Sequence, residues 1–479
     1  MKHPHLVIIM ADQLRPDFVG RPFTPYINQL MAESTVFSRA YCSSPLCVPA
    51  RGSFFTGTYP SENGCLINPW ATQDRDHGLV RENLTNLYAW LDDTWDSWHT
   101  GKQHLFTQQA FDRAPDSKTH WLSLENGYDD YLEQVGQRKP GGADFKAALP
   151  ELVGGLTTHR RSYSIPTTGC YEGDFDSFFD GYILNKSLEA IQQRDRTKPF
   201  LLNAMFLAPH PPLEIPEPYY SQAPAMDLPE NVGHWAKDQS PLQMYNLTGY
   251  LGGRYSRDDW AKIWPIYAGL VSLLDDCVGR IIASLKTEGL YDDAVIVFVA
   301  DHGEMLGSHC LWQKMCMYEE SIRTPLAIKL PQREAQVKMV NDLVSHVDML
   351  PTLCDLIGVE TPAQVSGQSF TESIRSGHSF SRDHVFVQFD GNGALGSFQR
   401  CVVQGDYKLI VDVFKDEIFF ELYDVVHDPQ EMTNLAFETR DITTSLYTLL
   451  LDHMQSTDDH LLLSLTDYDR FLTSYTPLR

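Results

Sequence analysis

The stretch of sequence from Ala294 to Gly303 reads AVIVFVADHG. Its residues up to Ala300 are all apolar and mostly β-branched, which is typical of a strand buried on both faces of a parallel sheet. The preceding segment, Leu270–Leu285, has apolar residues at helical spacing, so a helix leads into this strand. A helix followed by a doubly buried strand is the building unit of an open α/β sheet.

Other apolar runs extend the same pattern along the chain. Strands are predicted at His5–Met10, Val36–Tyr41, Trp95–Thr100 and Phe200–Leu207. Thr24-Pro25 opens a predicted helix that runs to Ala32, with the hydroxyl as N-cap and proline in the first turn. Together these elements predict an α/β fold, in which helices sandwich a large, mostly parallel sheet.

After about residue 365 the helical pattern fades. The segments 384–389, 400–413 and 417–425 predict a small antiparallel sheet, followed by a final helix at Thr443–His453. We therefore predict a catalytic domain over residues 1–365 and a small α+β subdomain over residues 366–479.

Composition excludes several classes of protein. The chain has 479 residues, of which 43% are hydrophobic, so it has enough apolar surface to fold around a core. Its 38 Lys and Arg against 63 Asp and Glu give a net charge of −25, and no dense basic run is present. This charge argues against a nucleic-acid partner, and it disfavours long polyanionic substrates more than small ones.

The N-terminal sequence and the cysteine spacing exclude further classes of protein. The apolar run Leu6–Met10 is too short for a signal peptide, and no stretch approaches the ~20 apolar residues of a membrane helix. We expect a cytoplasmic protein without membrane contact if Met1 is the native start. The nine cysteines include no CxxC pair, so neither a disulfide framework nor a zinc cluster is predicted.

Polar side chains follow several of the predicted strands. Asp12, His210 and the pair Asp301-His302 each come just after an apolar run. A single Asp in this position commonly caps a loop or a helix. Because ligands bind at the carboxyl ends of the strands in open α/β sheets, several such ends predict a shared site.

The segment SPLCVPARG, residues 44–52, contains the pattern Cys-x-Pro-x-Arg. Read alone, Cys47 fits a buried thiol better than a catalytic residue. Pro49, however, favours the start of a helix, which would leave Cys47 at the helix N-terminus, where backbone amides favour an anion. Arg51 could face the same point.

With these residues in view, the chain resembles the type I sulfatases of the alkaline phosphatase superfamily. Cys47-x-Pro-x-Arg51 followed by Thr56-Gly57 is similar to the family's activation signature, and Asp12-Gln13 to its first metal motif. The resemblance covers nearly the whole chain in the family's order. Its other elements are GKQHL (101–105), APHPP (208–212), DHGEMLGSHCLWQK (301–314) and MYEESIRTPL (317–326).

The resemblance implies a modified nucleophile. In this family the cysteine is oxidised to formylglycine, so Cys47 would need a formylglycine-generating or radical sulfatase-maturing enzyme as a partner. One hydroxyl of the aldehyde hydrate attacks sulfur, and the other then expels sulfate by regenerating the aldehyde.

It also implies a divalent metal ion. Asp12, Gln13, Asp301 and His302 would hold this ion together with an oxygen of modified Cys47. Ca²⁺ is the family's usual ion. The family commonly has Asp at the position of Gln13 and often Asn at that of His302, so Mn²⁺ competes with Ca²⁺, and Mg²⁺ suits the oxygen ligands.

The remaining roles are likewise implied by the resemblance. Arg51 would anchor the hydrate, and Lys102 and Lys314 would grip the sulfate oxygens. His104 would orient or deprotonate the hydrate, and His210 would protonate the leaving alcohol.

Two other functions are consistent with the sequence. One is a phosphonate monoester or phosphodiester hydrolase of the same superfamily, which Asp12-Gln13 and Asp301-His302 also resemble. The other is a binding protein that kept the fold, with Cys47 as an ordinary thiol. We predict a small sulfated substrate.

The alcohol portion of the substrate is not readable from the sequence, nor is the oligomeric state. Segments 211–260, 66–80 and 390–398 are predicted to shape the pocket. Aromatic side chains in the first of these segments fit either the pocket or loop packing, and packing is favoured. They are Tyr219, Tyr220, Trp235 and Tyr255.

Overall fold

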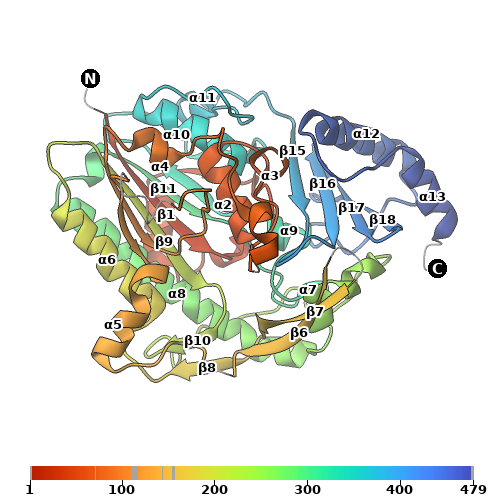
Figure 1. Cartoon of the computed structure of the whole chain (residues 1–479), viewed down its shortest axis with the longest axis horizontal. Coiled ribbons are helices and arrows are strands. Elements are labelled where there is room, and N and C mark those ends of the chain that lie inside the picture. The colour runs from red at the N-terminus through yellow and green to blue at the C-terminus, as the bar shows by residue number, and fades with distance from the viewer. Residues whose placement is uncertain (1–2, 71, 111–116, 143, 154–156, 476–479) are drawn as a thin grey trace.

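The structure is a computed structural model that describes residues 3–70, 72–110, 117–142, 144–153 and 157–475. An eight-stranded sheet forms its centre (Figure 1). In spatial order its strands are β13 (Met339–Val340), β2 (Thr35–Phe37), β12 (Leu326–Lys329), β11 (Ala294–Ala300), β1 (His5–Asp12), β9 (Phe200–Pro209), β4 (Asp96–Gly101) and β5 (His120–Ser123). All neighbouring strands are parallel except at β12, which runs antiparallel to both of its neighbours. The predicted α/β sheet is confirmed.

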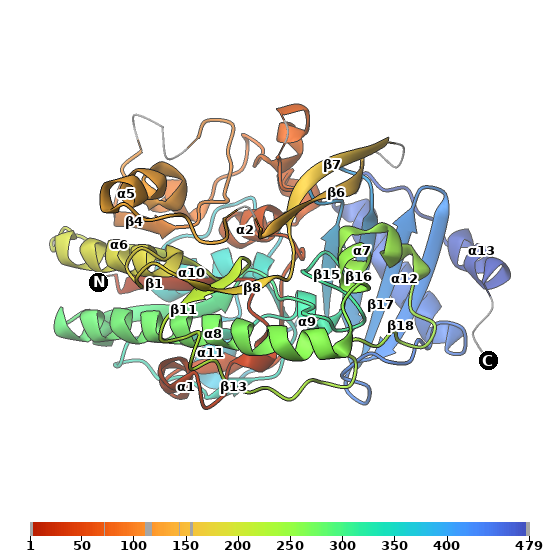
Figure 2. The ribbon, with the colours of Figure 1, turned by 90° about the horizontal axis from the view of Figure 1, so that it is seen from below.

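The sheet is buried on both faces because successive side chains of a strand point to opposite sides. In β1, Val7 and Ile9 pack into one hydrophobic core, whereas Leu6 and Ile8 pack into the other. Figures 1 and 2 show helices on both sides of the sheet. The first core is covered by α1 (Pro25–Ala32), α6 (Phe179–Gln193) and α8 (Arg257–Thr287), and the second by α2 (Cys47–Thr56), α4 (Leu87–Leu91), α10 (Met349–Ile357) and α11 (Thr371–Ser376).

Helix α8 is longer than its predicted core at 270–285. Ser256 caps it by accepting a hydrogen bond from the amide of Asp259, and the helix continues through Pro265. The apolar stripe extends upstream through Trp260 and Trp264, both buried. The segment 211–260 upstream of this stripe consists largely of loops, and it also contains β10 (Leu213–Pro216) and α7 (Leu247–Gly252).

Two predicted strands are each divided. The segment 36–41 becomes β2 in the main sheet and β3 (Ala40–Tyr41), which pairs with β14 (Val344–Ser345) instead. The segment 400–413 becomes two strands joined by a turn at Gly405, whose φ of 57° favours glycine. These two strands belong to a four-stranded antiparallel sheet of β15 (His384–Phe389), β16 (Phe398–Gln404), β17 (Tyr407–Phe414) and β18 (Glu417–Asp424).

The final part of the chain packs helices against this smaller sheet (Figure 1). They are α12 (Arg440–Ser456), which contains the predicted final helix, and α13 (Thr466–Ser474). A buried ion pair joins the sheet to the larger part, because Lys408 of β17 lies 3.2 Å from Glu319 of α9 (Glu319–Ile322). The domain boundary at 365 stays a prediction.

Several elements were not predicted. The most relevant to the site is a hairpin of β6 (Lys146–Val153) and β7 (Thr157–Ser164), in which Lys146 pairs with Ser164. Figures 1 and 2 show it beside the four-stranded sheet. Its Arg161 donates a hydrogen bond to the carbonyl of Gly393, 2.8 Å away. Others include α3 (Pro60–Asn63), α5 (Tyr128–Val135), α6 and β8 (Thr168–Tyr171), which pairs with β10.

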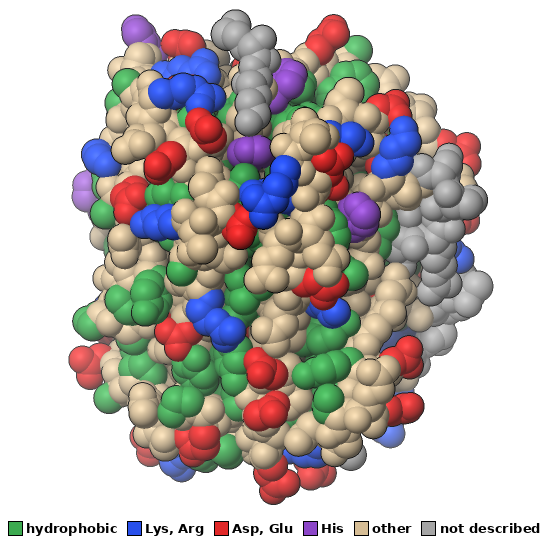
Figure 3. Space-filling view, turned by 90° about the vertical axis from the view of Figure 1, so that its left-hand side faces the viewer, with side chains coloured by type: hydrophobic (Ala, Val, Ile, Leu, Met, Phe, Trp, Pro, Cys, Tyr) green, Lys and Arg blue, Asp and Glu red, His purple; other side chains and the backbone are tan. Residues whose placement is uncertain are grey.

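The surface and the cysteines agree with the composition. No helix in the described part of the chain is long and apolar enough to cross a membrane. On the face seen in Figure 3, Lys and Arg side chains occur in small, separate groups among acidic and uncharged ones. All nine cysteines are free thiols, as predicted.

A buried carboxylate connects the fold to the candidate site. Asp180, in the first turn of α6, accepts hydrogen bonds from the amides of Leu207 and Ala208 at 2.8 and 2.9 Å. These amides lie at the end of β9, just before His210. Both bonds end on the same oxygen, Oδ1. Burial raises the pKa of Asp180 to about 7.

The raised pKa predicts a pH-dependent effect of Asp180→Asn. Between the usual aspartate pKa and about 7, the native state keeps a proton that the unfolded state loses, so Asp180 lowers the free energy of unfolding as pH rises. The amide keeps an oxygen for both backbone donors and carries no charge. We expect the Tm of the variant to rise relative to that of the wild type between about pH 4 and about pH 7, which are the usual and the raised pKa. Thermal unfolding at several pH values measures this difference. A Tm difference that is constant with pH would contradict this assignment.

Candidate active site

Four neighbouring strands end at one edge of the sheet, and each delivers a predicted site residue there. In spatial order β11 leads to Asp301, β1 ends at Asp12, β9 leads to His210 and β4 leads to Lys102. At Gly101, which has a φ of 90°, a Cβ atom would lie 2.0 Å from the carbonyl oxygen of Met205. Only glycine therefore lets β4 turn into Lys102 beside its neighbour.

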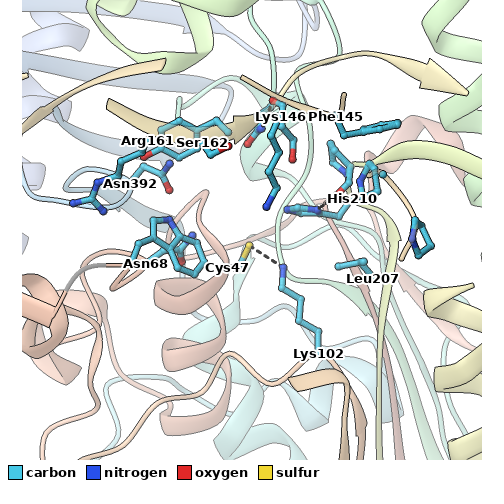
Figure 4. Close-up of a pocket in the computed structure, with 18 of the residues that line it drawn as sticks. Cys47, Asn68, Lys102, Phe145, Lys146, Arg161, Ser162, Leu207, His210 and Asn392 are labelled. Carbon is cyan, nitrogen blue, oxygen red and sulfur yellow. Dashed lines mark hydrogen bonds between the residues drawn. The ribbon is translucent and has the colours of Figure 1, made fainter. Parts of the chain in front are cut away.

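Cys47 is the first residue of α2, as the position of Pro49 predicted. The whole helix is buried, and its second amide, that of Val48, donates to Oδ1 of Asn68 at 3.1 Å. The Sγ atom lies 3.2 Å from Nε2 of His302 and 3.5 Å from Nζ of Lys102 (Figure 4). The thiol thus sits at a helix N-terminus, a position that favours a negative charge.

Arg51 lies one helical turn beyond Cys47 and holds the two carboxylates. Its Nη2 is 3.0 Å from Oδ2 of Asp12, and its Nε is 3.0 Å from Oδ2 of Asp301. Its Nη1 donates to the carbonyl of Lys102 at 3.0 Å. All three nitrogen atoms of the guanidinium group are therefore engaged, and this geometry ties the ends of β1, β11 and β4 together.

A compact group of metal-ligand atoms lies around Cys47. The ligand atoms of Asp12, Cys47, Asp301 and His302 all lie within 4.8 Å of one another, and all four residues are buried. Nδ1 of His302 donates to the carbonyl of Gly303 at 3.0 Å, so Nε2 is left to bind a cation. Two carboxylates and an imidazole in this arrangement fit a divalent metal ion.

Gln13 extends this group. Its backbone has a φ of 66°, its side-chain amide nitrogen donates to the carboxylate of Glu304, and its Oε1 accepts from Nζ of Lys314 at 2.5 Å. The amide is thereby oriented, with its oxygen turned toward the cationic side of the site. Glu304 was not predicted as a site residue, although it lies in the quoted segment 301–314, because its partner is almost 300 residues away.

Charges in the site shift several pKa values. Burial disfavours the charged form of Asp12, but Lys102, His210 and Arg51 outweigh it and hold the pKa of this carboxyl well below its usual range. Burial and Asp12 likewise oppose ionisation of Cys47, yet Lys102 and Lys314 lower its pKa. The site is therefore organised to stabilise negative charge.

The environment of the two predicted catalytic histidines disfavours their charged forms. Burial lowers the pKa of both His104 and His210 well below the usual value, and Lys102 adds to the effect in each case. Nδ1 of His210 donates to the carbonyl of Pro211 at 2.6 Å, so its Nε2 is the nitrogen available to a ligand.

A cavity of about 820 Å³ opens above Cys47, Lys102 and His210 (Figure 4). As predicted, segment 66–80 contributes to it, through Asn68 and Trp70, and segment 390–398 contributes Asn392; Ala71 lies outside the described residues. The cavity also brings His104 and Lys314 to the same space.

Segment 211–260 does not shape the pocket as predicted. Among the described lining residues, only Pro211 and Pro212 come from it. Tyr219 and Tyr255 pack elsewhere, since Tyr219 donates to Asp276 at 2.6 Å and the ring of Tyr255 contacts Trp260. Tyr220 and Trp235 are 38% and 37% exposed, so the favoured expectation of packing is wrong for these two. The wall that this segment was expected to supply is formed instead by the hairpin β6–β7.

The chain is similar to known sulfatases over nearly its whole length. It is 28% identical to the uncharacterized sulfatase YidJ of Escherichia coli K12, over 96% of this chain and 88% of that protein. It is 26% identical to an arylsulfatase of Clostridium perfringens, over 98% of both. A phosphonate monoester hydrolase of Agrobacterium radiobacter shares the fold, with a TM-score of 0.75 and 22% identity over 95% of this chain and 96% of that structure.

Family models agree with these similarities. The model described as N-sulphoglucosamine sulphohydrolase, C-terminal, matches residues 307–457. The model described as Sulfatase matches residues 4–359, which include every strand end that forms the site. With most of its length matched in this way, the chain belongs to the sulfatase family.

Proposed function

We propose that this protein hydrolyses a sulfate monoester to an alcohol and inorganic sulfate, using a formylglycine made from Cys47 and a divalent metal ion. The observation that carries the proposal is the position of Cys47. Its Sγ lies at the buried N-terminus of α2, within 3.2 Å of His302 and 3.5 Å of Lys102, in the group formed with the carboxylates of Asp12 and Asp301.

The proposed metal ligands are Asp12, Gln13, Asp301, His302 and an oxygen of the modified Cys47. Once formed, the hydrated formylglycine would supply an attacking hydroxyl. A bound metal ion would supply a Lewis acid for a sulfate oxygen. Carboxylate and amide oxygens favour Ca²⁺, while the imidazole makes Mn²⁺ or Mg²⁺ the alternatives.

Formation of formylglycine requires a maturing enzyme as a partner. Cys47 is 1% exposed, and all of α2 is buried. We infer that this enzyme acts on the segment 44–52 before α2 packs against the sheet.

The cationic side chains divide the work of binding. Lys102, from the segment 101–105, and Lys314, from the segment 301–314, both line the cavity and bind sulfate oxygens. Arg51 is fully engaged with Asp12, Asp301 and the Lys102 carbonyl, so it keeps the two carboxylates in place and contributes positive charge beneath Cys47.

Histidines move the protons. Nδ1 of His104 is buried without a hydrogen-bond partner among the described residues, so this ring is available to orient the nucleophile and take its proton. His210 gives a proton to the leaving alcohol through Nε2. An anionic ester bound to Lys102 and Lys314 offsets their charge, which raises the pKa of His210 toward the range a general acid needs.

The test uses protein made in a host that contains a formylglycine-forming enzyme. We expect a higher kcat/KM on nitrophenyl sulfate than on a nitrophenyl phosphonate monoester, and no turnover of either by Cys47→Ala. Mass spectrometry of the tryptic peptide 40–51 reports the state of Cys47. A modified protein that prefers the phosphonate would support the second candidate, a phosphonate monoester hydrolase, which the Gln13 and His302 ligand pair favours.

The role of His210 predicts a dependence on the leaving group. Nitrophenolate leaves without protonation, whereas an alkoxide does not. His210→Asn should therefore lower kcat/KM on an alkyl sulfate at least about tenfold more than on nitrophenyl sulfate, in line with the size of general-acid effects. His104→Asn is the matched comparison, and its losses should be similar on both esters. If His210→Asn lowers kcat/KM equally on both esters, His210 is not the general acid.

The contact between Glu304 and Gln13 predicts weaker metal binding in Glu304→Gln. One carboxylate oxygen of Glu304 accepts from Gln13 and the other from the amide of Leu306 at 2.9 Å, so the single amide oxygen of the variant cannot serve both donors and the Gln13 amide would be held less firmly. We expect metal affinity to fall about 10- to 100-fold, as for other outer partners of metal ligands, measured by equilibrium titration of the metal-free protein. The control is Glu62→Gln in the capping box of α3, which is remote from the ligand group. An unchanged affinity in Glu304→Gln would contradict the orienting role.

A further inference from the structure

The cavity above Cys47 carries more positive charge than the sulfate-binding floor requires. Lys102 and Lys314 lie at its floor, and four more cationic residues line its wall and rim: Lys139, Lys146, Arg160 and Arg161. None of the described lining residues is Asp or Glu. In a chain with a net charge of −25, this concentration of cations is local.

The four outer cations are not equivalent. Arg161 donates to the carbonyl of Gly393 at 2.8 Å and pairs with Asp74 at 3.3 Å. Lys139 pairs with Asp129 at 2.7 Å. These two side chains therefore have structural partners that already offset or use their charge.

Lys146 has a different environment. Figure 4 shows its side chain pointing from the hairpin into the cavity, with the ammonium group directed toward His210 and Cys47. No acidic residue of the described chain forms an ion pair with Lys146 or with Arg160, the fourth outer cation, and both residues are exposed. A cation that points into a cavity above an anion-binding floor is placed to meet a second anionic group of the same ligand.

The surrounding wall indicates what that ligand is. In the hairpin register Lys146 pairs with Ser164, and Ser162 lies two residues along the same strand face. Asn392 lies beside Ser162 (Figure 4), and Asn68 and Trp70, which is 51% exposed, also line the cavity. Hydroxyls, amides and an exposed aromatic ring suit a polyhydroxylated ring better than an alkyl chain.

We propose that the alcohol portion of the substrate is a sugar that carries a second anionic group, a carboxylate or a further sulfate, and that Lys146 binds this group. The proposal rests on the proposed sulfatase function and assigns its substrate class. The acidic surface repels long polyanions, while charges within the cavity act over a few ångströms. A short saccharide satisfies both conditions.

The test compares substrates that differ only in the second anionic group. One pair is an O-sulfated methyl glucuronide with a free carboxylate and its carboxyl methyl ester. The other is a glucosamine with N- and O-sulfates and its N-acetyl counterpart with the same O-sulfate. For the wild type, we expect kcat/KM to favour the charged member of at least one pair by about tenfold or more, as for a charge-assisted hydrogen bond. The pair that shows the preference distinguishes a carboxylate from a sulfate.

Variants assign the preference to Lys146. Lys146→Gln should reduce it to about twofold or less, and Lys146→Arg should retain it, because only the charge is essential. Lys139→Gln is the matched control on the same rim and should retain the preference. A preference that survives in Lys146→Gln, or is lost only in Lys139→Gln, would overturn the assignment.

For a sugar that the enzyme does not hydrolyse, inhibition constants provide the same comparison between the charged and uncharged members of a pair. Inhibition of nitrophenyl ester hydrolysis by each member of a pair gives the ratio of inhibition constants, and the expected effects of the variants are the same. Equal constants for both members in the wild type would overturn the proposal. Turnover of the phosphonate without the sulfate would instead refute the sulfatase function, and the ratio of inhibition constants would still test Lys146.

Discussion

The structure depends on holding two buried carboxylates together at the ends of adjacent parallel strands. Asp12 ends β1 and Asp301 follows β11, and neither side chain is exposed. Two such charges repel each other and are costly to remove from water, so their position requires compensating cations. Arg51 compensates both with one side chain, at 3.0 Å from each carboxylate, and Lys102 forms a further buried ion pair with Asp12. Since Arg51 belongs to α2, this compensation also determines where Cys47 lies.

The same constraint explains how rigid elements surround the site. The guanidinium of Arg51 binds the backbone of Lys102 as well, so β4 joins the network through the glycine that lets it turn. Asp180 fixes the end of β9 by backbone hydrogen bonds, which positions the loop of His210. Asp12, Cys47, Lys102 and Asp301 therefore come from or directly follow the end of a buried strand or helix, whereas Lys314 and the wall of the cavity come from loops and a hairpin. Chemistry and substrate choice are carried by different parts of the fold.

This division determines how much could be predicted from the sequence. Buried strands produce continuous apolar runs, so the central strands and the polar residues that follow them were predicted, and these residues do meet at one edge of the sheet. The hairpin β6–β7 was not predicted, because its strands, KAALPELV and TTHRRSYS, lack a clear apolar alternation. The contact between Gln13 and Glu304 joins distant parts of the chain, and no local pattern signals such a pair. The first half of α8 was not predicted, because Pro265 is a residue that usually interrupts a helix. The buried tryptophans of this half stabilise the helix by packing.

The net charge illustrates the limit of composition as evidence. A value of −25 describes the average field around the whole surface, which salt screens over a Debye length of about 8 Å at physiological ionic strength. Within the cavity, the nearest charges decide, and there the described lining residues are neutral or cationic. An acidic exterior and a cationic cavity are compatible because each acts over its own distance. The exterior selects against long anionic chains, and the cavity selects for anionic groups on a small molecule. A catalytic centre that binds sulfate thus gains selectivity from the same acidic charge that argues against nucleic acid and long polyanions.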